Sequence, residues 1–115
     1  MLLEPIELAR EIADVISDKQ GSDIVILDTG KVSSIADYFL IASVNSERQA
    51  KAVLDDIDKK MKEHKKLPLS IDGVGTGWTL LDYGDVIVHI FDPATRDFYD
   101  LEDLWSNAPV VVRIQ

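Results

Sequence analysis

Two aspartates and a histidine, Asp82, Asp85 and His89, lie in the most apolar part of the chain, the stretch W-T-L-L-D-Y-G-D-V-I-V-H-I-F from Trp78 to Phe91. Buried strands rarely keep ionisable groups without a partner. Carboxylate and imidazole groups at such short spacing could ligate a metal ion or exchange protons with a substrate. They could equally belong to a surface that binds another protein. The geometry of this stretch decides between the two interpretations.

The stretch is too long for a single strand, because it would extend over roughly 46 Å. Gly84 supplies a break, and we predict a tight hairpin with Tyr83 and Gly84 at its tip. Across the two strands, this hairpin places the following residues opposite each other: Asp82 and Asp85, Trp78 and His89.

Side chains alternate between the two faces of such a hairpin, and here the faces differ in character. One face is almost entirely aliphatic and is expected to lie under helices: Thr79, Leu81, Val86, Val88 and Ile90. The other mixes aromatic, aliphatic, acidic and imidazole groups: Trp78, Leu80, Asp82, Asp85, Ile87 and His89. The second face predicts a surface that binds a partner rather than a hydrophobic core.

A metal site is the less favoured alternative for this face. Asp82 and Asp85 could share a Mg²⁺ ion through their oxygens. His89 lies roughly 13 Å further along the strand, too far to ligate the same ion. Hydrogen bonds to turn amides explain both aspartates without any ion. We therefore expect no metal.

The sequence also lacks the motifs that other classes of reaction require. Nucleotidyl transfer needs an Asp-x-Asp pair on a strand, whereas Asp56-Ile57-Asp58 lies in a predicted helix. The glycines of G-V-G-T-G, 73–77, match neither a P-loop nor a dinucleotide-binding fingerprint. No nucleophile elbow surrounds any of the serines, and His64 lies in a lysine-rich stretch that predicts solvent exposure. We expect no catalytic residue and no cofactor.

The elements that position this hairpin follow from periodicity and caps. A helix is predicted over Glu4–Lys19, and a second helix after Ser46, which forms a capping box with Gln49. Strands are predicted over Asp23–Asp28, Tyr38–Val44 and, near a sheet edge, Pro68–Ile71. Residues 98–105 predict a short strand followed by a short helix that begins near Asp100, and the tail 108–115 shows no clear element. The order predicts a single α/β domain, 1–115, with a mixed sheet of about five strands.

The charge of the chain restricts its partners. Twelve basic residues stand against twenty-one acidic ones, for a net charge of −9. This charge disfavours direct nucleic-acid binding and favours a basic protein partner, although solubility alone explains it equally well. The absence of cysteine excludes disulfides and thiol catalysis. No apolar run reaches the ~20 residues of a membrane span, and the N-terminus lacks the basic start of a signal peptide, which predicts a cytoplasmic protein.

Three segments closely resemble the Iojap family, also called the ribosomal silencing factor family. They are S-S-I-A-D-Y-F-L-I-A-S (33–43), the hairpin stretch 78–91, and F-Y-D-L-E-D-L-W (98–105). The resemblance extends from the first strand to Trp105. It departs locally where S-V-N-S, 43–46, replaces a more usual T-G-T-S, and where G-V-G-T-G replaces a more charged turn.

The resemblance implies a nucleotidyltransferase-like fold that has lost its catalytic acids. Members of the family bind the large ribosomal subunit at ribosomal protein number fourteen, block joining with the small subunit and lower translation when nutrients are short. Relatives act in ribosome biogenesis in mitochondria and chloroplasts. Partner-binding residues are then expected to be Trp78, Leu80, Asp82, Tyr83, Asp85, Ile87, His89 and Tyr99, with the acids pairing to basic side chains. Two rivals remain open: a nucleotide-binding or nucleotidyltransferase-like enzyme, and a homodimer that forms through the same exposed face.

Overall fold

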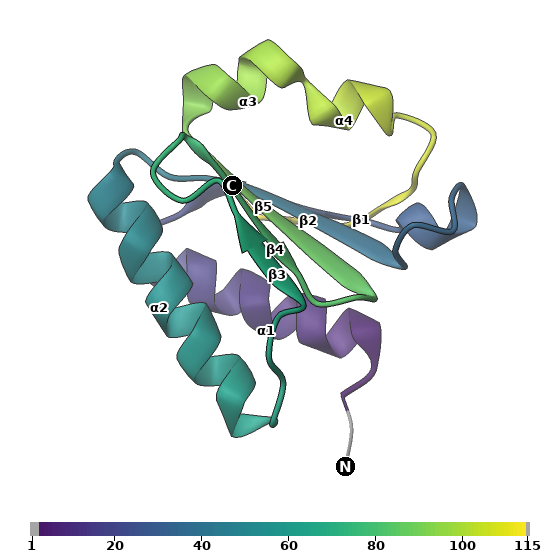
Figure 1. The fold of residues 1–115 in the computed structure, drawn as a ribbon. Coiled ribbons are helices and arrows are strands. Elements are labelled where there is room, and N and C mark those ends of the chain that lie inside the picture. The colour runs from purple at the N-terminus through teal and green to yellow at the C-terminus, as the bar shows by residue number, and fades with distance from the viewer. Residues whose placement is uncertain (1–2, 115) are drawn as a thin grey trace.

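Within residues 3–114, which the computed structural model describes, six strands form one mixed sheet in the order β3-β4-β5-β2-β1-β6 (Figure 1). The strands are β1 (Ser22–Leu27), β2 (Tyr38–Ser43), β3 (Ser70–Asp72), β4 (Trp78–Asp82), β5 (Val86–Phe91) and β6 (Val110–Ile114). β2 and β5 pair in parallel, and the other neighbours pair antiparallel. The predicted α/β class with a mixed sheet is confirmed, with one strand more than expected.

Two long helices, α1 (Pro5–Asp18) and α2 (Glu47–Glu63), cover one face of the sheet (Figure 1). Pro5 begins α1, and the Glu7 carboxylate accepts the backbone N–H of Glu4. Ser46 Oγ accepts the backbone N–H of Gln49, so Ser46 caps α2 as predicted. The Gln49 side chain accepts the N–H of Asn45 and not that of Ser46, so the predicted capping box is incomplete.

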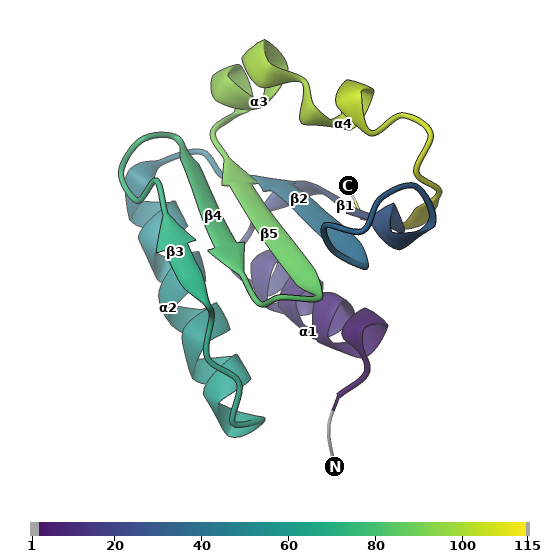
Figure 2. The same ribbon diagram turned by 45° about the vertical axis from the view of Figure 1, so that its right-hand side comes forward.

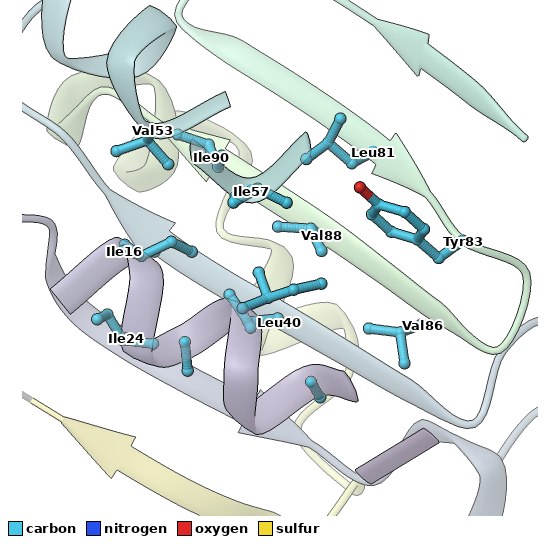
Figure 3. Close-up of a cluster of buried hydrophobic side chains, with 14 of the residues drawn as sticks. Ile16, Ile24, Leu40, Val53, Ile57, Leu81, Tyr83, Val86, Val88 and Ile90 are labelled. Carbon is cyan, nitrogen blue, oxygen red and sulfur yellow. The ribbon is translucent and has the colours of Figure 1, made fainter. Parts of the chain in front are cut away.

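Beneath these helices lies the main hydrophobic core (Figure 3). Its sheet side comes from alternate positions of the central strands: Ile24, Leu40, Leu81, Tyr83, Val86, Val88 and Ile90. Its helix side includes Ile16, Val53 and Ile57. The aliphatic face predicted for the hairpin thus lies under helices, as expected from its alternation.

Two shorter helices, α3 (Pro93–Tyr99) and α4 (Leu101–Leu104), lie on the opposite face of the sheet (Figure 2). The strand predicted at 98–105 is therefore wrong, although a helix does begin next to Asp100. Asp92 caps α3 by accepting the backbone N–H of Thr95, and Pro93 occupies its first position. A second core fills the space below: Val25, Leu27, Ala36, Phe39, Ile41, Phe91, Leu101 and Ala108.

The tail forms β6, contrary to the expectation of no clear element, and pairs antiparallel with β1. The apolar run Val110–Val112 lacks clear alternation, so its strand character depends on a partner distant in the sequence. Gln115 lies outside the described residues. The short η1 turn (Thr29–Lys31) precedes β2. None of the helices within 3–114 combines the length and the apolar character needed to span a bilayer.

Candidate functional site

The chain reverses at Gly84, as predicted, but the strands pair in a different register. The backbone N–H of Tyr83 donates to the carbonyl of Val86, which places Gly84 and Asp85 at the tip. Asp82 therefore lies opposite Ile87, and the predicted pairing of Asp82 with Asp85 is wrong. Trp78 lies opposite Phe91 instead of His89. Asp82 Oδ1 accepts the backbone N–H of Gly84 at 2.7 Å, a local bond that favours this turn.

The change of register leaves the two faces of the hairpin intact. The partner of Asp82 moves from Asp85 to Ile87, an even number of positions, so each side chain keeps its face. The face opposite α1 and α2 carries the residues predicted for it on the two strands: Trp78, Leu80, Asp82, Ile87 and His89. The residues of this set differ in burial: some of their side chains reach the surface, and others lie beneath it.

Tyr83 is a core residue and not a tip residue. Its side chain is only 5% exposed and lies among the aliphatic residues under the helices (Figure 3). Burial, aided by the negative charge of Asp58, raises the pKa of Tyr83 to about 12. The prediction that Tyr83 lies at the hairpin tip is therefore wrong, because its ring fills space in the main core.

His89 is also buried, with 4% of its surface exposed. Its Nδ1 accepts a hydrogen bond from the indole Nε1 of Trp78 at 3.1 Å, and its ring lies against Phe39 at a centroid distance of 4.9 Å. Burial lowers the pKa of His89 to about 4, so the imidazole is neutral at pH 7. With Nδ1 as acceptor, the proton lies on Nε2, for which the described residues offer no hydrogen-bond partner. Its predicted surface position is therefore wrong, and it supports Trp78 from beneath.

Trp78 is half-buried, between the second core and solvent. Its ring stacks on Phe91 at a centroid distance of 4.9 Å and contacts the ring of Tyr99 at 4.8 Å. The bond to His89 fixes the indole plane from below. An aromatic side chain held on three sides in this way is preorganised for contact with a partner, since it loses little conformational freedom on binding.

The helices α3 and α4 lie over the β5–β2–β1 part of the sheet and leave this side of β3 and most of β4 uncovered (Figure 2). At the start of β4, Tyr99 of α3 contacts Trp78. We call the uncovered surface the docking face and define it by Trp78, Leu80, Asp82, Asp85, Ile87 and Tyr99. Asp85 and Tyr99 are exposed, and the other four are half-buried. The side chains of Ser70 and Asp72 in β3 extend the same face, because they pair with Asp82 and Leu80.

Charge is distributed unevenly around this face. Residues 67–112 contain a single basic residue, Arg96, and eight acidic ones: Asp72, Asp82, Asp85, Asp92, Asp97, Asp100, Glu102 and Asp103. Much of the negative charge of the chain therefore belongs to the elements around the docking face. A partner with a basic surface is attracted to it.

Arg96 is a structural residue that the sequence did not reveal. Its buried guanidinium donates through Nη1 to the carbonyl of Asp23 and to Ser43 Oγ, and through Nε to Glu102 at 2.8 Å. These bonds tie α3 and α4 to the start of β1 and the end of β2, and so help to hold Tyr99 beside Trp78. The spacing of Arg96 and Glu102 follows no helical rule, since the chain turns at Asp100, whose φ is 45°.

Residues weighed for catalysis are engaged elsewhere. Asp56 and Asp58 on α2 form ion pairs with Lys19 and Lys62. His64, predicted to be solvated, is half-buried, and its Nε2 lies 3.0 Å from the Glu11 carboxylate on α1. Among residues 3–114 no group of three or more histidine or acidic side chains is placed to hold a metal ion.

A mixed six-stranded sheet between two helical layers, with an acidic and partly aromatic open face, defines the class of this protein as a single α/β domain. Comparison with known proteins identifies its family. The family model described as "Ribosomal silencing factor during starvation" matches residues 3–115. The chain therefore belongs to the ribosomal silencing factor family, which confirms the resemblance inferred from its motifs.

The relatives agree in sequence and in structure. The ribosomal silencing factor RsfS of Chromobacterium violaceum is 38% identical over 102 residues, which cover 88% of this chain and 84% of that protein. The factor of the same name from Bacillus subtilis is 38% identical over 99 residues, with coverage of 85% and 84%. A crystal structure of a Chromobacterium violaceum protein matches this fold with a TM-score of 0.85 at 36% identity, over 90% of this chain and 88% of that one. The two sequence relatives are named as silencing factors and not as enzymes.

Proposed function

We propose that this protein represses translation by binding the large ribosomal subunit through its ribosomal protein number fourteen, and that it thereby blocks association with the small subunit. Membership of the silencing factor family supports the ribosome as the partner. The observation that carries the proposal is the docking face, an open and acidic part of the sheet with a preorganised Trp78.

The proposed mechanism needs no chemical step. A domain with extents of 34 × 33 × 24 Å occupies space that the small subunit would need at the joining surface. The net charge of −9 keeps the domain from binding ribosomal RNA indiscriminately and directs it toward a basic protein. Repression then depends on where the domain binds and on how long it stays.

The proposed contact residues have separate roles. Trp78, Leu80 and Ile87 supply apolar contact area, and Tyr99 extends it onto α3. Asp85 at the tip and Asp82 beside it pair with basic side chains of the partner. The buried Tyr83 and His89 act from beneath, by fixing the hairpin and the indole.

The test is co-sedimentation with purified large subunits, followed by a light-scattering assay of subunit joining. We expect the wild-type protein to bind and to slow joining. We expect the variant Leu80→Lys with Asp85→Lys to lose at least about tenfold in affinity, because both changes place positive charge against a basic surface. Asp14→Lys is the matched control, since Asp14 is an exposed acid on α1, on the other side of the sheet.

Two results would contradict the proposal: wild-type protein that leaves subunit joining unchanged, or a double variant that still binds at full strength. The thermal unfolding midpoint of each variant must remain close to that of the wild type for the comparison to hold. Sedimentation velocity of the free protein tests the related hypothesis that two copies pair through the docking face. If they do, the double variant will remain a monomer at concentrations where the wild type dimerises.

A further inference from the structure

An open cavity of about 540 Å³ lies at the end of the docking face where β4 begins. Three of its six lining residues are aromatic, and the full set is Thr76, Trp78, Ala94, Thr95, Phe98 and Tyr99. The ring of Tyr99 lies 4.8 Å from that of Trp78 and meets Phe98 edge to face at 5.0 Å. Phe98 is 81% exposed and Tyr99 50% exposed, so the two adjoining rings form an exposed apolar patch of the kind that marks binding sites.

Specific contacts build the wall of this cavity on the side of the β3–β4 loop. Gly77 has a φ of 87°, and a Cβ at this position would collide with Oδ2 of Asp92 and lie 3.0 Å from Oγ1 of Thr95. The backbone N–H of Asp92 donates to the carbonyl of Gly77 at 2.8 Å. The glycine-rich turn 73–77 is therefore fixed against the start of α3 and is not a loose connection.

The electrostatics of the cavity favour a cation. Aromatic rings present a negative face to their surroundings. The Asp92 carboxylate accepts the backbone N–H of Thr95, a lining residue, and hydrogen bonds from Thr95 lower its pKa, so it is ionised at neutral pH. The lining residues include no basic side chain, and the surrounding segment 67–112 has only the buried Arg96.

We propose that this cavity, which we call the aromatic pocket, binds an arginine side chain of the protein partner. The planar guanidinium stacks on the rings of Trp78 and Tyr99, while its aliphatic stem lies along Phe98. Arginine fits better than lysine, because the guanidinium is flat and more weakly hydrated. The inference rests on the proposed function and states how the docking face recognises a basic partner.

A small-molecule probe tests the pocket without the ribosome. We would titrate ¹⁵N-labelled protein with ethylguanidinium chloride and follow the two tryptophan indole N–H signals, Trp78 and Trp105. Ethylurea is the uncharged control of similar shape, and butylammonium is the lysine-like control. We expect ethylguanidinium to shift the Trp78 signal along a saturating curve, with butylammonium weaker, ethylurea inactive and Trp105 nearly still. Equal responses to ethylurea, or tighter binding of butylammonium, would overturn the proposal.

Two variants test whether the aromatic pocket contributes to binding of large subunits. Tyr99→Leu keeps an apolar wall but removes the aromatic face, so we expect ethylguanidinium and large subunits to bind about fivefold or more weakly. Leu104→Ala is the control, because Leu104 is exposed on α4 and does not line the pocket. Equal affinities of Tyr99→Leu and Leu104→Ala, with both variants folded, would contradict the pocket.

The two proposals fail in different ways. Wild-type protein that co-sediments with large subunits, while its Trp78 signal ignores ethylguanidinium, would overturn the pocket and leave the proposed function standing. A saturable Trp78 response without co-sedimentation would overturn the ribosomal function instead, and would leave the arginine pocket without its proposed partner.

Discussion

The indole N–H of Trp78 donates to Nδ1 of His89 across 3.1 Å, from the edge of the docking face into the second core. The two residues lie on adjacent strands but are not directly opposite, because Trp78 pairs with Phe91 and His89 with Leu80. A buried neutral imidazole thereby sets the orientation of a half-exposed indole. The predictions below follow from this arrangement and from the contacts that hold α3 in place.

Acid should destabilise the fold through His89. The pKa of its buried imidazole is about 4, whereas a histidine in the unfolded chain has a pKa near 6.5. Between these values the unfolded state binds a proton that the folded state does not, so the free energy of unfolding falls as the pH falls. The contribution is fully present above pH ~6.5 and decreases by about 3 kcal/mol on the way to pH ~4.

Urea unfolding of the wild type and of His89→Leu, at several pH values from 7.5 to 4.5, measures this contribution. The carboxylates titrate in both proteins, so the difference between the two curves isolates the imidazole. We expect the wild type to lose stability more steeply than the variant as the pH falls through this window. Parallel curves would show that His89 keeps an ordinary pKa in the folded protein.

The Trp78–His89 bond should appear as a coupling energy between the two positions. Trp78→Phe keeps an aromatic ring against Phe91 and Tyr99 but removes the indole donor, and His89→Leu removes the acceptor. A double-mutant cycle on the free energy of unfolding should yield a coupling of about 1 kcal/mol, typical of a partly buried hydrogen bond. Additive effects of the two single changes would mean that the bond contributes nothing measurable.

Much of this site follows from alternation alone, and its remaining features do not. The assignment of Trp78, Leu80 and Ile87 to one face needed only the period of a strand and a reversal near Gly84. The register of the β4–β5 hairpin depended on Tyr83, because its ring is buried in the main core instead of lying at the tip. A two-residue Tyr-Gly loop would need a positive φ at Tyr83, whereas a Gly-Asp loop places the glycine first, where Gly84 has a φ of 88°. The turn chemistry therefore favoured the observed register, and the prediction did not use it.

The missed elements depend on long-range contacts. β6 is a strand because β1 offers it an edge, and nothing in V-V-V-R-I specifies that partner. The role of Arg96 is not visible in the local sequence, because its guanidinium reaches Asp23 and Ser43, which are distant in the sequence. His89 looked exposed because its strand neighbours could not show that α3 and α4 fold back over the sheet.

Loss of the Arg96 guanidinium should loosen α3 and α4 and weaken partner binding from a distance. Arg96→Met preserves most of the side-chain volume but leaves Glu102 and Ser43 without their donor. We expect a loss of about 2–4 kcal/mol in the free energy of unfolding, because a buried charged network is broken on one side. Hydrogen exchange should accelerate in 93–104 and remain unchanged in α1 and α2.

The exposed Arg113 on β6 provides the matched control, since Arg113→Met removes the same chemical group from the surface. We expect it to change the free energy of unfolding by less than about 0.5 kcal/mol. If the two variants proved equally stable, Arg96 would have no part in holding the helices.

Gly77 and Gly75 allow the packing of the β3–β4 loop to be measured by a matched pair of substitutions. Both have positive φ, 87° and 83°, so an alanine at either position incurs a similar backbone cost of about 1–2 kcal/mol. At Gly75 the new methyl group would meet nothing within 4 Å, whereas at Gly77 it would collide with the Asp92 carboxylate that caps α3. Gly77→Ala should therefore lower the free energy of unfolding by about 1–2 kcal/mol more than Gly75→Ala, because it also disturbs the cap.

Urea unfolding measures this difference, and the amide signal of Thr95 should move in Gly77→Ala alone. The same variant should lose the response of Trp78 to ethylguanidinium, because the loop that walls the aromatic pocket is displaced, while Gly75→Ala retains it. Equal destabilisation by the two alanines, with the Thr95 signal unmoved, would mean that the glycine-rich turn does not hold the pocket in shape.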